Sequence, residues 1–148
     1  MYLGIDLGTS SMKCLLIGEE QQLIKSVSSD EIPLVSLHSG WSEQDPKHWI
    51  EALNQCLTKL KADINLNQIK SISFSGHMHG ATCIDKNNEV LRPCMMWNDT
   101  RSHQECKEIM SNSSVLDISG NIAMPGFTAP KVLWLKHNEQ KIFDQIHK

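Results

Sequence analysis

The stretch "GIDLGTSSMK", residues 4–13, carries the most information about the fold of this chain. An apolar run ends near the carboxylate of Asp6, a turn led by Gly8 carries three hydroxyl residues, and a second apolar run starts at Met12. This pattern predicts two antiparallel strands joined by a tight turn. Such a turn can present backbone N–H groups, hydroxyls and the cation of Lys13 to phosphate oxygens.

A second interpretation of this stretch stays open on these residues alone. Gly-hydroxyl turns are common in plain β-hairpins, where Asp6 would only accept hydrogen bonds from the turn amides. The stretch matches neither the Walker A loop nor the G-x-G-x-x-G fingerprint, so it excludes the nucleotide-binding classes that those motifs define.

The neighbouring segments extend the predicted sheet and cover it with a helix. "QQLIKSVSS", residues 21–29, predicts a third antiparallel strand, and "IKSISFSG", residues 69–76, a further strand. Between them Asp45 and Pro46 are typical of a helix start, and we expect the helix to end near Asp63. Its apolar stripe has the spacing of an amphipathic helix and consists of Trp49, Leu53, Cys56, Leu57 and Leu60.

The second half of the chain alternates short strands and helices. Residues 81–93 predict a hairpin that turns at 86–88, residues 94–99 a short strand, and residues 101–112 a helix. Residues 118–131 predict a loop, and residues 129–148 one or two helices with Thr128 as the cap. Ile142, Phe143 and Ile146 close the chain without an evident packing partner, which favours an incomplete domain.

Composition restricts the functional classes. The chain has 148 residues, of which 40% are apolar and 21% charged, and this is typical of one soluble globular domain. A net charge of −3 disfavours a partner that is nucleic acid or an anionic membrane. The absence of a long apolar run and of a basic leader predicts a cytoplasmic protein. Five scattered cysteines without a C-x-x-C pair predict free thiols.

The segment "GHMHG", residues 76–80, holds the other candidate site. His77 and His79 with Cys83 could hold zinc, but structural zinc sites usually draw on closely spaced ligand pairs that this chain lacks. A partly buried core histidine and a wall of a ligand pocket are the alternatives. Methionine supplies an adaptable apolar surface and imidazole a donor or acceptor for hydroxyl groups.

Taken in order, several motifs resemble one known family. Besides the opening stretch these are "GWSEQDP" at 40–46, "SGHMHGA" at 75–81, "WND" with Arg101 at 97–101, "GN" at 120–121 and "MPGFTAPK" at 124–131. The series resembles the FGGY carbohydrate kinases of the actin and hexokinase superfamily, and within them the xylulokinase branch. The resemblance implies an α/β fold of ribonuclease-H-like type, a mixed sheet with flanking helices. Residues 1–148 would be an incomplete N-terminal, sugar-binding domain.

The resemblance also implies residue roles, a substrate pair and a metal. The reaction would transfer a phosphoryl group from ATP to D-xylulose with Mg²⁺, giving xylulose 5-phosphate. Asp6 would be catalytic and lie near a hydrated Mg²⁺. The nucleotide phosphates would meet Gly8, Thr9, Ser10 and Lys13, and the ketose would meet Met78, His79 and Trp97, with Asp99 and Arg101 bracing the pocket. His77 and Ser11 depart from the family pattern, which commonly has Gln and Gly at these positions.

In this family the general-base aspartate and the adenosine-binding domain lie further along the chain than Lys148. We therefore expect the 148 residues to hold part of the site and to be inactive alone. A non-catalytic fragment, another FGGY kinase acting on glycerol, gluconate or ribulose, and, more remotely, a zinc-binding module remain as alternatives. Apolar groups left without cover predict a possible homodimer.

Overall fold

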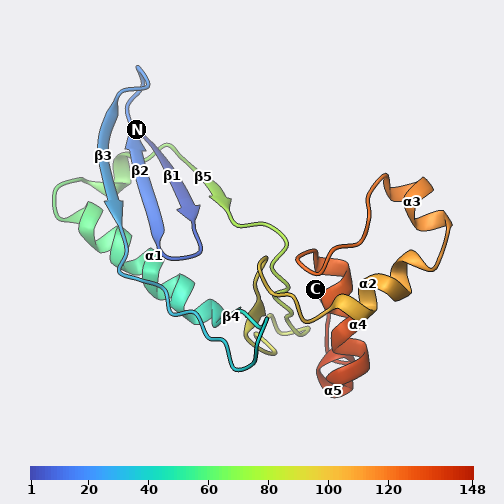
Figure 1. Cartoon of the computed structure of the whole chain (residues 1–148). Coiled ribbons are helices and arrows are strands. Elements are labelled where there is room, and N and C mark those ends of the chain that lie inside the picture. The colour runs from blue at the N-terminus through green and yellow to red at the C-terminus, as the bar shows by residue number, and fades with distance from the viewer. The chain divides into compact units, whose positions relative to one another are not determined.

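The computed structural model describes all residues from Met1 to Lys148, and they form two compact units. The first unit comprises Met1–Pro33 and Lys47–His77, and the second Leu34–Pro46 and Met78–Lys148. Each unit therefore draws on two separate segments of the chain (Figure 1). None of the helices has the length and apolar character that crossing a bilayer requires.

The first unit is a four-stranded mixed sheet with one long helix. Its strands are β1 (Tyr2–Leu7), β2 (Met12–Ile17), β3 (Leu23–Ser28) and β5 (Ser71–Gly76), in the order β3-β2-β1-β5. The first three strands pair antiparallel, as predicted, and β5 pairs parallel with β1. The parallel pair is possible because α1 (Pro46–Lys61) and the 3-10 helix η1 (Leu66–Gln68) lie between the third strand and β5 in the sequence.

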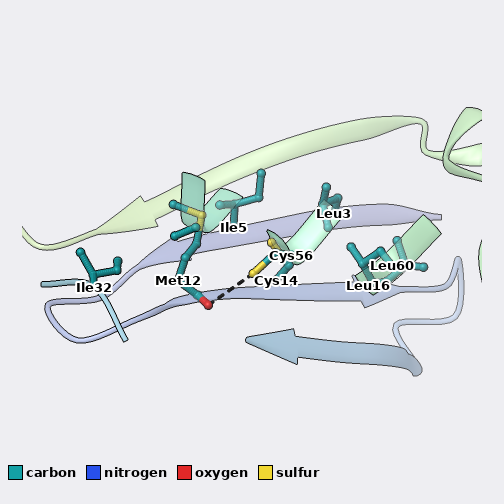
Figure 2. Packing of buried hydrophobic residues seen from close by; sticks show 9 residues of the cluster. Leu3, Ile5, Met12, Cys14, Leu16, Ile32, Cys56 and Leu60 are labelled. Atoms are coloured by element: carbon teal, nitrogen blue, oxygen red, sulfur yellow. Dashed lines mark hydrogen bonds between the residues drawn. The ribbon is translucent and has the colours of Figure 1, made fainter. Parts of the chain in front are cut away.

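One face of this sheet packs on α1. Alternate residues of β1 and β2 are buried there, as period-2 patterning predicts, together with Cys56 and Leu60 of the helix (Figure 2). The other residues of the predicted helix stripe, Trp49, Leu53 and Leu57, are partly buried against them. The buried cluster consists of Leu3, Ile5, Met12, Cys14, Leu16, Ile32, Ala52, Cys56 and Leu60. The opposite alternation turns the side chains of Asp6 and Lys13 away from this core, and both are exposed.

Two thiols lie inside this core. Cys14 of β2 and Cys56 of α1 are fully buried, and the Cys56 thiol donates to the carbonyl oxygen of Met12 at 3.5 Å (Figure 2). Burial, with the neighbouring Cys56, raises the pKa of Cys14 from about 9 to about 12. Burial likewise raises the pKa of Cys56. The folded protein therefore keeps these thiols protonated at pH values where the unfolded chain ionises them.

This difference predicts an alkaline loss of stability. Between about pH 9 and 12 the unfolded state binds fewer protons than the folded state, so the free energy of unfolding falls as pH rises. The stabilisation that comes from the protonated Cys14 thiol is fully present below pH 9. Urea midpoints measured from pH 8 to pH 11 should decline, and Cys14→Ala should make that decline shallower. Leu16→Val, which removes a methylene from the same core, should leave the slope unchanged; equal slopes in all three proteins would contradict the assignment.

The second unit contains short strands and most of the helices. Its elements are β4 (Glu43–Gln44), β6 (Cys94–Met95), α2 (His103–Met110), α3 (Ser114–Ser119), α4 (Thr128–Asn138) and α5 (Gln140–Phe143). β4 and β6 form a two-stranded antiparallel sheet. The predicted hairpin exists as a single bridge between Ile84 and Val90, with Asn88 at φ 63° in its turn. The short helix α3 was not predicted.

The core of the second unit corrects two expectations. Phe143 and Ile146 pack against a buried cluster of Ala81, Cys83, Met95 and Leu135, so these two apolar residues do have cover. The expected cap residue Thr128 is instead the first residue of α4, and Phe127 takes the N-cap position without a side-chain cap bond. Thr128 as cap is therefore wrong.

Candidate functional site

The predicted site residues fall into two groups, one in each unit. The first group surrounds the turn between β1 and β2. The N–H of Gly8 donates to the carbonyl of Ser11 at 3.1 Å, and a Cβ on Gly8 would approach that oxygen to 3.0 Å. The carbonyl of Ser10 accepts from the N–H of Ile32 at 2.8 Å. The turn is therefore tight, and the hydrogen bond from Ile32 holds it in place. The lack of space beside Gly8 explains why a glycine begins the turn.

Charged and hydroxyl side chains meet on the exposed face of the sheet next to this turn. The strand register places Asp6 of β1 opposite Lys13 of β2 on one side and Ser75 of β5 on the other. Residues paired in register point to the same face, so a carboxylate, an ammonium group and a hydroxyl are neighbours there. Asp6 is exposed. This arrangement can hold a hydrated cation or a phosphate group.

The second group lies on two neighbouring segments of the second unit. Ala81 and Met95 exchange backbone hydrogen bonds of 2.9 and 3.3 Å. His79 precedes this bridge by two residues and Trp97 follows it by two, so both side chains belong to adjoining segments. Met78 is 68% exposed and Trp97 49% exposed, values that are high for side chains of this size. The structure therefore brings the predicted ketose residues together on an accessible surface.

His79 has a special backbone conformation. Its φ is 66°, in the left-handed region that residues other than glycine rarely adopt. Its imidazole lies 4.7 Å from the ring of Phe127, centroid to centroid, at a tilt of 33°. The ring of Phe127, which the sequence did not single out, therefore packs beside the imidazole of His79.

A buried ionic network lies behind this surface. Asp99 accepts from the N–H of Ser42 at 2.7 Å and from the guanidinium of Arg101 at 2.6 Å. Burial opposes ionisation of Asp99, but these hydrogen bonds outweigh it and keep the pKa of Asp99 below its usual range. Glu43 accepts from Arg101 at 2.6 Å and from Arg92 at 2.5 Å. These contacts agree with a bracing role for Asp99 and Arg101.

Trp41 belongs to the same network. The guanidinium carbon of Arg101 lies 3.6 Å from the centre of the Trp41 ring and 5.0 Å from the centre of the Trp134 ring. The Arg101 side chain is only 1% exposed, so this is a desolvated cation–π contact. Trp41 follows Gly40 in an irregular segment, where the sequence alone is compatible with either a pocket wall or an anchor of the loop. The structure makes it an anchor.

His77 has different surroundings from His79, although only Met78 separates them. It ends the first unit, where its N–H donates to the carbonyl of Leu7 at 3.0 Å and its ring makes an edge contact with Trp49 at 5.3 Å. The side chain is half-buried. This matches the partly buried histidine of the sequence analysis. The structure has no group of three or more His, Cys, Asp or Glu side chains that could hold a metal ion, so nothing supports the zinc alternative.

Lys131 is the residue that sequence reasoning missed. Its side chain is fully buried, and its ammonium group donates to the carbonyls of His79 at 2.8 Å and Gly126 at 2.7 Å. A signal for it existed, because Lys131 precedes the buried Leu135 by four residues and so shares its helix face. "MPGFTAPK" carried the family resemblance, but no role was given to its lysine.

The mixed sheet with its flanking helix is a fold that this chain shares with known proteins. Solved structures that match nearly the whole chain include sugar kinases of the actin and hexokinase type, which confirms the predicted α/β fold. The family model "FGGY family of carbohydrate kinases, N-terminal domain" matches residues 1–148. The chain therefore belongs to the FGGY carbohydrate kinases.

Individual relatives give a narrower picture. The chain is 42% identical to a xylulose kinase from Klebsiella pneumoniae over its whole length, and it covers 31% of that relative. A crystal structure of a xyloylose kinase from Brucella ovis has 46% sequence identity and a TM-score of 0.95. The match covers 99% of this chain and 31% of the Brucella ovis chain. A crystal structure of Plasmodium falciparum glycerol kinase with ADP has 26% sequence identity and a TM-score of 0.85. That match covers 97% of this chain and 30% of the glycerol kinase chain. The chain thus spans about a third of the length of such relatives.

Proposed function

We propose that this chain is the N-terminal part of an ATP-dependent kinase that phosphorylates the terminal hydroxyl of D-xylulose. The observation that carries the proposal is the exposed group of Met78, His79 and Trp97 on adjoining segments of the second unit. Membership of the FGGY family and the similarity to xylulose kinases support it. A glycerol kinase is among the structural neighbours, so the sugar itself is the point that needs testing.

The three side chains suit a ketose chemically. The face of Trp97 can lie against the C–H groups of the sugar, and Met78 can adapt its shape beside it. The imidazole of His79 can donate to one hydroxyl or accept from another. Phe127 packs beside this ring and the left-handed backbone sets the direction in which it leaves the chain, so both would influence which hydroxyl it meets.

The phosphate side would be supplied by the first unit. Lys13 and the hydroxyls of Thr9 and Ser10, in the turn that Gly8 begins, can contact nucleotide phosphates. Asp6 fits Mg²⁺ as a single exposed carboxylate, because this ion usually keeps several waters and takes few protein ligands. When bound, the ion would neutralise charge on the phosphoryl oxygens.

The second candidate, a fragment without catalytic activity of its own, is favoured by the hydrogen bonds of two aspartates of the second unit. Asp99 is fully buried and paired with Arg101, and Asp85 accepts from the N–H groups of Asn87 and Glu89 at 2.8 and 2.9 Å. Neither carboxylate is placed to take a proton from a sugar hydroxyl. The two candidates are compatible, since one concerns the whole enzyme and the other these 148 residues.

A coupled ADP-release assay decides between substrates. The full-length protein that contains this chain should use D-xylulose with a kcat/KM at least about tenfold above that for D-ribulose, glycerol or gluconate. A site built to bond the hydroxyls of D-xylulose leaves polar groups unpaired when one hydroxyl has the other configuration, as in D-ribulose, when hydroxyls are missing, as in glycerol, or when a carboxylate must be accommodated, as in gluconate. A preference for glycerol would overturn the xylulose proposal. The 148 residues alone should release no ADP, and turnover by them would contradict the fragment candidate.

A further inference from the structure

Lys131 combines two properties that the proposed reaction does not use. It is a lysine without solvent exposure, and both of its hydrogen-bonded acceptors are backbone carbonyls on separate segments. Burial lowers the pKa of Lys131 to about 8, although the charge of Asp99 acts in the opposite direction. Lysine is rarely buried in this way unless its ammonium group is satisfied.

The first acceptor belongs to the residue in the left-handed conformation. By donating to the carbonyl of His79, the ammonium group fixes the peptide plane that follows this histidine. Uncommon backbone conformations of this kind persist where the surroundings determine them fully. The ring of Phe127, four residues before Lys131, holds the same histidine from its side chain.

The second acceptor lies against Trp97. A Cβ on Gly126 would come within 2.5 Å of the carbonyl oxygen of Trp97, so the backbone of the loop that leads into α4 lies directly on the tryptophan backbone. The bond from Lys131 to the carbonyl of Gly126 keeps the loop there. One ammonium group therefore links the segments that carry His79 and Trp97.

We propose that Lys131 is a positioning residue for the sugar site, which sets the distance and orientation between His79 and Trp97 without touching the sugar. This role rests on the proposed function, because the proposed function is what assigns sugar contacts to His79 and Trp97. It accounts for a buried ammonium group where an apolar residue would pack more simply. It also accounts for glycine at position 126, where any side chain would push the loop away from Trp97.

The test is steady-state kinetics of the full-length protein carrying Lys131→Met, which keeps the unbranched stem and removes the donors. We expect KM for D-xylulose to rise at least about tenfold, while KM for ATP stays within about twofold, because misplacement affects only the sugar side. Lys131→Arg, which restores donors, should recover part of the loss. Lys136→Met, an exposed lysine of the same helix, is the matched control and should behave like wild type.

Hydrogen exchange gives a readout that does not depend on activity. Peptides covering residues 78–83 and 124–130 should exchange faster in Lys131→Met, and the peptide of the β1–β2 turn should not change. Unchanged exchange, or faster exchange with an unchanged sugar KM, would overturn the proposal. If Lys131→Met does not fold, Gly126→Ala replaces it, because this change disturbs the residue whose carbonyl accepts from Lys131. It should raise KM for the sugar and speed exchange in the same peptides.

The two proposals can fail separately. If wild type prefers glycerol or gluconate, the proposed function fails, and the KM for that substrate becomes the kinetic measure for Lys131. A variant that lowers kcat and the folded fraction but leaves KM for the sugar unchanged would show that Lys131 only stabilises the fold.

Discussion

Replacing Asp6 by asparagine in the full-length enzyme should lower kcat by at least about 100-fold, the loss typical of removing one preorganised electrostatic group from an active site. Asparagine has nearly the same shape but no charge to hold the waters of Mg²⁺. Asp6 is exposed at the end of a strand, so the fold should not change. The measurement is initial rates of ADP release over a range of Mg²⁺ concentrations.

A second aspartate of the first unit provides the control for this experiment. Asp30 is exposed and pairs only loosely with Lys59, at 3.6 Å, so Asp30→Asn should leave kcat unchanged. If Asp6→Asn retained wild-type kcat at every Mg²⁺ concentration, Asp6 would have no part in phosphoryl transfer. The turn beside it would then be an ordinary hairpin, the interpretation that the sequence left open.

Replacing Asp99 by alanine should have the largest effect on stability. The change leaves the guanidinium of Arg101 buried with only Glu43 as an anionic partner, and removes the acceptor of the Ser42 N–H group. Removing one partner of a buried ion pair destabilises proteins by about 3–5 kcal/mol. Urea unfolding followed by tryptophan fluorescence would measure this, because Trp41 stacks on Arg101.

Two further variants make the Asp99 experiment specific. Asp117 is an exposed aspartate of the same unit, and Asp117→Ala should change the free energy of unfolding by no more than about 0.5 kcal/mol. Asp99→Asn keeps one acceptor and should fall between the two. A loss for Asp99→Ala as small as that for Asp117→Ala would mean that Glu43 alone satisfies Arg101.

Regular patterning explains why the first unit was predictable. In β2 buried and exposed residues alternate strictly, and in α1 the apolar residues recur at three and four positions, so local sequence and tertiary packing agree. The parallel pairing of β5 with β1 could not be obtained in this way. This pairing depends on how the chain returns to the sheet after α1, and the periodicity of apolar residues carries no information about that.

The second unit was less predictable because its contacts are long-range and polar. A sequence pattern can suggest that Asp99 and Arg101 pair, since they are two residues apart. It cannot show that Trp41 and Glu43 close around the same guanidinium. Lys131 is the clearest example, because a lysine on a helix is ordinarily assigned to the solvent. Only the positions of two distant carbonyls explain its burial.

The left-handed backbone at His79 limits which substitutions can be used to test the proposed sugar site. Most replacements at this position carry a conformational penalty unrelated to the sugar, whereas glycine and asparagine tolerate the backbone. A library randomised at residue 79 would therefore be enriched in these two residues for reasons of folding. Met78, which is 68% exposed and carries no such restriction, is the better position at which to search for new substrates.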